Sequence, residues 1–175
     1  MKQQVSPKSL KPGCVLFAYD AFTYDDGGSS VELQQWVVRN IRAKRYSGIF
    51  RGTVLNPKPL KFVNLICKLD GITWFKGQWK KYIPDYHKKG FRQGSLLPRG
   101  VYTTKLMALK YAVKRWEGEV GWYPGEIKDC NDDPEFKLEL EREYTETQKE
   151  LRLLKGQLTK LNNKRKKEKT NAINN

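Results

Sequence analysis

The chain has 175 residues, and its 34 lysine and arginine residues outnumber its 19 aspartate and glutamate residues, giving a formal net charge of +15. This length suits one globular domain with an appendage and is short for two independent cores. No run of about 18 apolar residues is present and the start lacks an apolar signal stretch, which excludes a helical membrane protein and a classical secreted one.

The cysteines argue against two further classes of protein. Cys14, Cys67 and Cys130 are odd in number, far apart and not in a CxxC spacing, so a disulfide framework is not expected. With His87 as the single histidine, a zinc site would need all four scattered residues to converge. We therefore expect reduced thiols, no metal, no cofactor and a cytoplasmic location.

The first third of the chain predicts an extended segment followed by strands. Residues 1–12 are polar and contain two prolines, and residues 14–19 form a short apolar run typical of a strand. The turn-rich residues 25–30 are expected to close a hairpin. Residues 31–46 fit a helical stripe as well as one face of a strand, and we favour the strand because strand-like segments follow.

Those strand-like segments are residues 49–55, 61–69 and 72–82. Asp70-Gly71 between the last two is a hairpin signal. Residues 13–83 therefore predict a meander of about five antiparallel strands, since no long helix separates them. Residues 84–100 mix prolines and glycines with basic residues and predict an irregular loop, interpreted either as a phosphate clamp or as a solvated connector.

Two helices are expected after the sheet. Thr103-Thr104 predicts the start of a helix over about 103–117, and the glycines and proline from Gly118 onward predict its end. Asp133 as N-cap and Pro134 in the first turn predict the start of the second helix, within a segment spanning 131–163. We expect one basic domain over 13–130 and a disordered basic tail over 164–175.

The second helix carries a heptad-like seam. Its apolar positions alternate in spacings of four and three, as in a coiled coil. The seam residues are Leu140, Tyr144, Thr147, Leu151, Leu154, Leu158 and Leu161. They predict a homodimer or a partner helix, with a helix that folds back onto its own domain as the alternative.

The most informative feature is the charge between Arg39 and Arg115, where nineteen basic residues accompany two acids, Asp70 and Asp85. Aromatic rings alternate with lysines over residues 74–82, a combination suited to stacking on bases and neutralising phosphates. The alternative is that the rings are core and the lysines a solvated face. The candidate nucleic-acid-binding residues are Arg39, Arg42, Lys44, Arg45, Trp74, Lys76, Trp79, Lys80, Lys81, Tyr82, Lys88, Lys89 and Arg92.

The order of parts resembles a loose class of small bacteriophage and prophage proteins, in which a compact β unit precedes an aromatic-Thr-Lys-x-x-Ala-Leu helix start and a coiled-coil tail. The matching residues are Tyr102, Thr104, Lys105, Ala108 and Leu109, with the tail from Pro134 onward. The resemblance covers residues 31–165, and the chain departs from it at Leu106 and Met107, where acidic residues are usual. It implies a phage origin and the host cytoplasm as the place of action, and it supplies no activity.

The opening Lys11-Pro12-Gly13-x-Val15 is similar to that of small SH3-like barrels, including those with a KOW motif that touch RNA or DNA. The expected fold class is thus α+β, with a small antiparallel SH3-like meander or barrel, a packed helix and a C-terminal coiled-coil helix.

Catalysis is the minority interpretation. His87 lies in a lysine-rich loop without a nucleophile motif, and no phosphate-binding glycine motif is present. A metal-dependent nuclease would need clustered acids, which Asp85 and the distant Glu126 suggest only faintly. We therefore expect a non-enzymatic protein that binds DNA, RNA or a nucleoprotein. The alternative is an inhibitor or adaptor, active in host takeover or anti-defence, that docks on a host enzyme.

Overall fold

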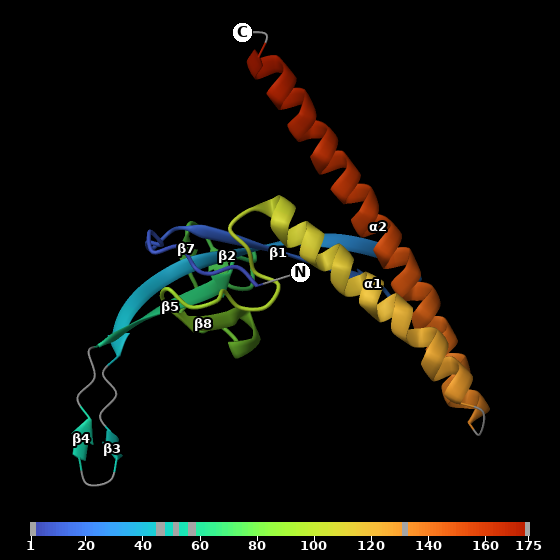
Figure 1. Cartoon of the computed structure of the whole chain (residues 1–175), viewed down its shortest axis with the longest axis horizontal. Helices are drawn as coiled ribbons and strands as arrows, with labels where there is room; N and C mark the ends of the chain where they lie inside the picture. The colour runs from blue at the N-terminus through green and yellow to red at the C-terminus, as the bar shows by residue number, and fades with distance from the viewer. Residues whose placement is uncertain (1–2, 45–47, 51–52, 56–58, 131–132, 174–175) are drawn as a thin grey trace. The chain divides into compact units, whose positions relative to one another are not determined.

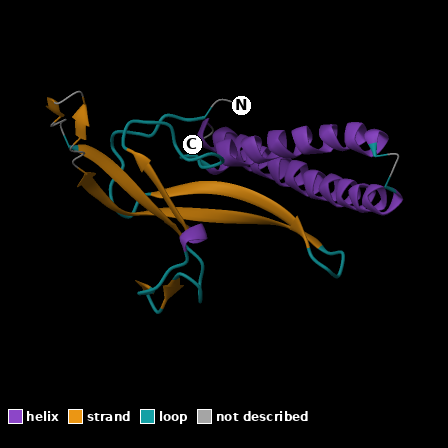
Figure 2. Cartoon of the chain, turned by 90° about the horizontal axis from the view of Figure 1, so that it is seen from below, coloured by secondary structure: helices purple, strands orange, loops and turns teal. Residues whose placement is uncertain are grey.

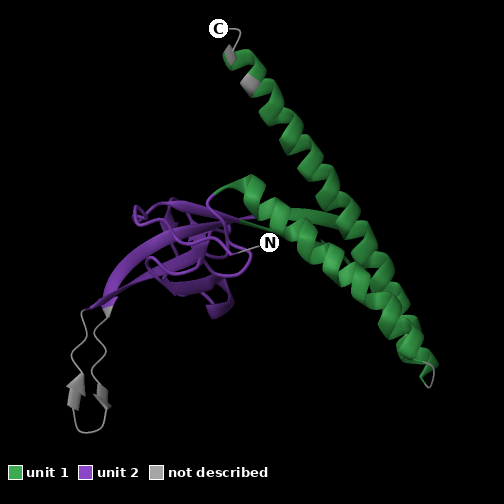
Figure 3. Ribbon diagram, in the orientation of Figure 1, with its two compact units in different colours: residues 1, 18–33, 104–175 green, residues 2–17, 34–103 purple. Residues whose placement is uncertain are grey.

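A computed structural model of the chain describes residues 3–44, 48–50, 53–55, 59–130 and 133–173. The architecture is α+β, with a curled antiparallel sheet of four strands and two helices (Figure 1). The chain forms two compact units, shown in separate colours in Figure 3. Unit 1 comprises residues 1, 18–33 and 104–175, and unit 2 comprises residues 2–17 and 34–103.

The sheet has the strand order β1-β2-β5-β8. Its strands are β1 (Val15–Thr23), β2 (Ser29–Lys44), β5 (Leu60–Cys67) and β8 (Lys88–Arg92). β2 is a strand over almost the whole segment for which a helix was the alternative, which confirms the strand prediction. A turn at residues 24–28 joins β1 to β2, with Tyr24 N donating to Gly28 O at 2.7 Å, so the predicted hairpin is also confirmed.

The strands of unit 2 bury an apolar face. Val38 on β2 pairs with Leu65 on β5, and Val63 on β5 pairs with Phe91 on β8; all four side chains are buried. Burial of one face fixes the register, because a slip of one residue would expose every one of these side chains.

Hydrogen bonds tie residues 3–12, at the N-terminus, to the rest of unit 2. Ser6 N donates to Ser95 O at 2.8 Å, and Ser6 Oγ accepts from Gly94 N at 2.8 Å. The Gln4 side chain donates to Thr103 Oγ1 at 2.8 Å, and Leu10 is buried. The segment is therefore part of the folded unit.

The prediction of an irregular loop over residues 84–100 was wrong at its centre, because Lys88–Arg92 form β8. A short 3-10 helix, η1 (Asp85–His87), precedes this strand. Phe91 is its single apolar residue, so the sequence shows no strand alternation. β8 exists because β5 offers it a ladder of partners, and lysines are common on such edge strands.

The strand predicted over residues 72–82 was also wrong. It is replaced by two short strands, β6 (Trp74–Phe75) and β7 (Gln78–Trp79), which form a separate hairpin outside the sheet (Figure 2). The φ angles of Lys76 and Gly77 are 46° and 82°, the positive values that the twisted two-residue turns of hairpins require.

Asp70-Gly71 does not form the predicted hairpin, since β5 pairs with β2 and β8 and not with β6. Here the chain makes a tight turn around Thr73, whose hydroxyl donates to Cys67 O at 2.7 Å and accepts from Leu69 N at 2.9 Å. In place of the single strand expected over 49–55 there are two short strands that pair antiparallel, β3 (Gly48–Phe50) and β4 (Thr53–Leu55). The SH3-like barrel stays a prediction.

Unit 1 is built on two long helices, α1 (Lys105–Asp129) and α2 (Pro134–Ile173), which lie along one another (Figure 2). Their starts match the prediction. The Thr104 side chain caps α1 by accepting from Met107 N at 3.3 Å, and Asp133 Oδ1 accepts from Phe136 N at 3.0 Å at the start of α2.

The ends of both helices were predicted wrongly. α1 continues past Gly118 through Pro124 to Asp129, because Trp116 and Tyr123 pack on α2 and this packing outweighs helix propensity. α2 is helical to Ile173, so most of the segment 164–175 is helical where disorder was expected.

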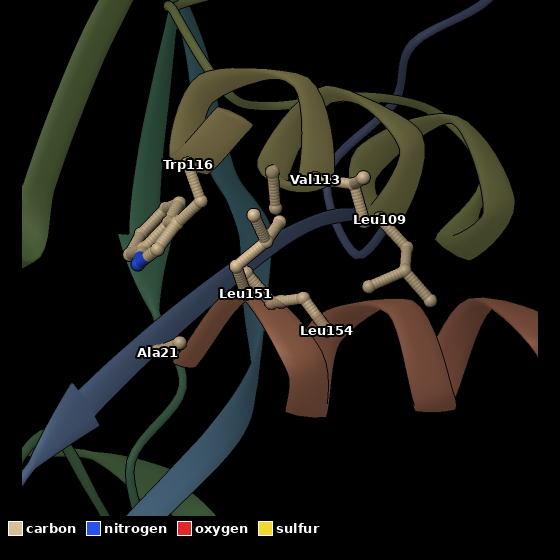
Figure 4. Packing of buried hydrophobic residues seen from close by; sticks show 7 residues of the cluster. Ala21, Leu109, Val113, Trp116, Leu151 and Leu154 are labelled. Atoms are coloured by element: carbon tan, nitrogen blue, oxygen red, sulfur yellow. The ribbon is translucent and has the colours of Figure 1, made fainter. Parts of the chain in front are cut away.

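The core of unit 1 lies between the two helices and the end of the β1–β2 hairpin. Leu109, Val113 and Trp116 of α1 point toward Leu151 and Leu154 of α2 (Figure 4). Glu150 Oε2 accepts from Trp116 Nε1 at 2.8 Å, and Glu150 Oε1 accepts from Thr23 Oγ1 at 3.0 Å. A carboxylate that joins three elements in this way fixes their register.

The seam of α2 is therefore used within the chain. Leu140, Thr147, Leu151 and Leu154 are buried, and Leu158 and Leu161 pack against the same cluster. Tyr144 contacts Tyr123 of α1, with ring centroids 5.7 Å apart. This is the fold-back alternative of the sequence analysis. The buried seam gives no reason to expect a homodimer.

Candidate nucleic-acid interface

Charge is divided unevenly between the two units. Unit 2 contains 18 basic and two acidic residues, a net charge of +16, whereas unit 1 contains 16 basic and 17 acidic residues, a net charge of −1. The positive field of the protein therefore originates in unit 2, and a polyanion is the kind of partner that such a field attracts.

Two asparagines and a glycine lie in a row across three neighbouring strands of unit 2. Asn40 on β2 pairs with Asn64 on β5, which pairs with Gly90 on β8. Asn64 Nδ2 donates to Asn40 Oδ1 at 2.6 Å, as expected for residues directly opposite one another. Gly90 adds no side chain: a Cβ there would lie 3.8 Å from Asn64 Oδ1. This amide row (Asn40, Asn64, Gly90) therefore stays open at the β8 end.

The amide row lines a hollow of ≈ 360 Å³. Four cationic residues also line it, namely Arg39, Arg42, Lys88 and Lys89. Neutral amides can donate to and accept from a ligand, whereas the cations can only donate. The combination suits an anion that carries further polar groups, such as a phosphodiester with its sugar and base.

Local structure explains how these cations reach the hollow. The register of β2 shifts between Val38 and Asn40, so Arg39 occupies a β-bulge, a feature that redirects a side chain. Arg39, Arg42 and Lys88 are exposed. Lys88 Nζ lies 2.9 Å from Asp85 Oδ1, an exposed pair that contributes little to stability and can exchange Asp85 for another anion.

Lys89 is held differently from the other three. Its ammonium lies 4.2 Å from the ring centroid of the buried Trp36, a cation–π contact. Lys89 pairs with Leu65, so its side chain lies with Trp36 on the buried face of the sheet, opposite the face of Asn64 and Gly90. Arg39, Arg42 and Lys88 are therefore the cations free to meet a ligand at the hollow.

The two tryptophans of the β6–β7 hairpin are engaged with their neighbours. Trp74 pairs with Trp79 across the hairpin, with ring centroids 4.8 Å apart and planes at 79°. Lys68 Nζ lies 4.7 Å from the Trp74 ring centroid. Both indoles are half-buried. These contacts leave the tryptophans with less free ring surface than the alternation of rings and lysines suggested.

Among the residues of unit 2 whose side chains the structure describes, three other aromatic rings are the most open to a ligand. Tyr82 is 80% exposed, Tyr86 is 75% exposed and Phe75 is 52% exposed. Sequence reasoning identified Tyr82 and missed the other two. Phe75 could have been found from the hairpin itself, since neighbouring strand residues face opposite ways and the half-buried Trp74 leaves Phe75 outside.

The remaining predicted residues do not gather at the hollow. Lys76 and Lys81 are exposed on the β6–β7 hairpin and the residues after it, and Lys80 Nζ donates to Gly71 O, so part of its role is structural. Arg92 is exposed at the end of β8. Lys44 is the last residue of β2, paired with Leu60, and Arg45 lies outside the described residues.

Among the described residues no group of three or more histidine, cysteine or acidic residues is placed to hold a metal ion, and no helix has the length and apolarity needed to cross a membrane. The His87 ring packs at 4.2 Å on that of Tyr86. No disulfide joins Cys14, Cys67 or Cys130.

Comparison with known proteins finds no matching family model, no matching curated protein and no matching solved structure. The chemistry of the surface is therefore the guide to the function of this chain.

Proposed function

We propose that this chain is a non-enzymatic nucleic-acid-binding protein and that unit 2 carries its binding surface. The observation that supports this most directly is the hollow on β2, β5 and β8, where three exposed cations, Arg39, Arg42 and Lys88, accompany a pair of hydrogen-bonded amides. Phosphate neutralisation by the cations would supply affinity through counterion release, with little sequence preference. A phage origin and action in the host cytoplasm remain part of this proposal.

The arrangement favours nucleic acid over a small anion. The hollow is open, and further exposed cations lie along the chain on either side of it, at Lys61, Lys81 and Arg92 among others. A single phosphate would use only a few of these charges, whereas a polymer of phosphates can engage many of them at once.

The test is a comparison of two triple variants by fluorescence anisotropy with a labelled oligonucleotide. Arg39→Ala/Arg42→Ala/Lys88→Ala removes three charges from the hollow. It should weaken binding at least about tenfold and make the log–log salt slope shallower by about 2 to 3. The matched control is Lys149→Ala/Arg152→Ala/Lys160→Ala, which removes the same charge from exposed positions of α2.

An equal loss of affinity in the two triple variants would mean that total charge, and not the hollow, determines binding. Wild-type protein that binds no oligonucleotide at low salt would contradict the proposed function itself.

A second candidate function, docking on a host protein as an inhibitor or adaptor, has its own supporting observation. Near the C-terminal end of α1 and the start of α2, the apolar side chains of Trp122, Phe136 and Leu138 are exposed. Aromatic residues such as Trp122 and Phe136 are enriched at the buried centres of protein interfaces. A pull-down from host lysate with and without nuclease separates the two functions, because a protein partner of this surface would persist after nuclease treatment.

A further inference from the structure

We infer that the nucleic acid bound by unit 2 is single-stranded, with its phosphates in the hollow beside the amide row and a neighbouring base stacked on Tyr86. The inference rests on the proposed function and adds the class of ligand and the positions of its parts.

The proposed stacking ring, Tyr86, lies close in the chain to a cation of the hollow. Tyr86 lies in η1, and Lys88 at the start of β8 lines the hollow. Tyr86 and Lys88 are two positions apart in the chain. Their Cα atoms therefore lie at most about 7.6 Å apart, since consecutive Cα atoms are 3.8 Å apart. A base on Tyr86 and a phosphate at Lys88 can therefore belong to the same or adjacent nucleotides.

The Tyr86 ring is largely exposed. Tyr86 is 75% exposed although it packs against His87, so much of its surface is available. An exposed aromatic ring next to several cations is the usual arrangement where unpaired bases stack. In a duplex the bases already stack on one another, so a ring at this position gains nothing from them.

Gly90 leaves the hollow without a side chain at its β8 end. This residue lies in an edge strand, where a glycine weakens the strand and often marks the close approach of a ligand. No positive φ requires glycine there, and a Cβ would make only ordinary contacts with Asn64 Oδ1 and Val63 O, both at 3.8 Å. Folding alone does not require this glycine. A strand of phosphates running over the amide row does benefit from the absent side chain.

The experiment measures the affinity of the full-length protein for fluorescein-labelled dT12, U12 and a 12-base-pair duplex at one salt concentration. We expect the single strands to bind about tenfold or more tightly than the duplex. The two single strands distinguish DNA from RNA as the source of the shared chemistry.

Two substitutions without a change of charge then locate the strand. Tyr86→Ala should weaken single-strand binding about five- to 150-fold, the range for loss of one stacked base. Tyr86→Phe should bind as wild type because the ring is kept. Gly90→Val should also weaken single-strand binding, because its side chain would cover the amide row, whereas Gly118→Val, the same change in open space on α1, should not.

A measurement on wild-type protein guards against variants that fail to fold. Ultraviolet cross-linking to 5-bromouracil-substituted single strands, read by peptide mass spectrometry, should modify Tyr86. Cross-links confined to other peptides would overturn the inference. So would equal affinity for single strands and duplex together with normal binding by Tyr86→Ala and Gly90→Val, while the proposed function would stand. Absence of all binding would contradict both.

Discussion

The two units of this chain use charge in opposite ways. Unit 1, with a net charge of −1, places its acids and bases on the same helices, where Arg115 pairs with Glu119 and Lys155 with Glu117, each at 2.9 Å. Unit 2 concentrates a charge of +16 on and around a curled sheet. A fold of this size does not require such a separation. The nucleic-acid binding proposed for unit 2 would account for this difference.

The units also differ in what holds them together. Unit 1 is held by an apolar seam between two helices, whereas unit 2 is held by strand pairing that brings residues 36–44, 60–67 and 88–92 together. Stability and binding should therefore respond to different substitutions.

The largest effect is expected in the seam of unit 1. Leu154 is fully buried, and Leu154→Ala should lower the free energy of unfolding by about 2–5 kcal/mol, through lost burial and the cavity left behind. Urea unfolding followed by circular dichroism measures this change.

The neighbouring Leu153 provides the matched control, since it is 40% exposed on the same turn of α2. Leu153→Ala should change stability by no more than about 0.5 kcal/mol. Comparable losses in the two variants would show that the face of α2 carrying Leu153 is covered in solution, as it would be in an oligomer.

The next effect concerns the charge of unit 2. If about five phosphates are contacted, the log–log slope of affinity against salt should be about −3.5 for a single strand. Affinity should then fall roughly 100-fold between 50 and 200 mM salt. Anisotropy titrations at four salt concentrations give the slope. An affinity that does not change with salt concentration would contradict a role for the charge of unit 2 in binding phosphates. It would favour docking on a host protein instead.

The sequence predicted the local features of the fold well. Residues 24–30 carry turn chemistry, and Thr104 and Asp133 cap helices with their own side chains, so each of these signals lies within a few residues. The seam of α2 was equally visible from its spacing. What the seam packs against was not, because a heptad pattern does not distinguish a second chain from α1 of the same chain.

Long-range pairing decided the features that sequence reasoning missed. Asn40 and Asn64 meet because a bulge at Arg39 sets the register of β2 against β5. No sequence pattern in either strand predicts this bulge. β8 contains Lys88, Lys89 and Gly90, which have no strand pattern and become a strand through β5. The basic residues of the candidate interface were thus found from composition, whereas the amide row among them was not.

The smallest effects contrast a glycine in each unit. Gly77 has a φ of 82° in the turn between β6 and β7, so Gly77→Ala should destabilise the protein by about 1–2 kcal/mol, the cost of a left-handed backbone for other residues. Gly118 lies within α1, with nothing within 4 Å of the position of an added Cβ, so Gly118→Ala should stabilise by about 0.4–1 kcal/mol. Thermal unfolding of the two variants beside wild type measures the pair. Melting temperatures that shift in the same direction would contradict this account, because opposite signs follow from the positive φ of the hairpin turn and the uninterrupted helix through Gly118.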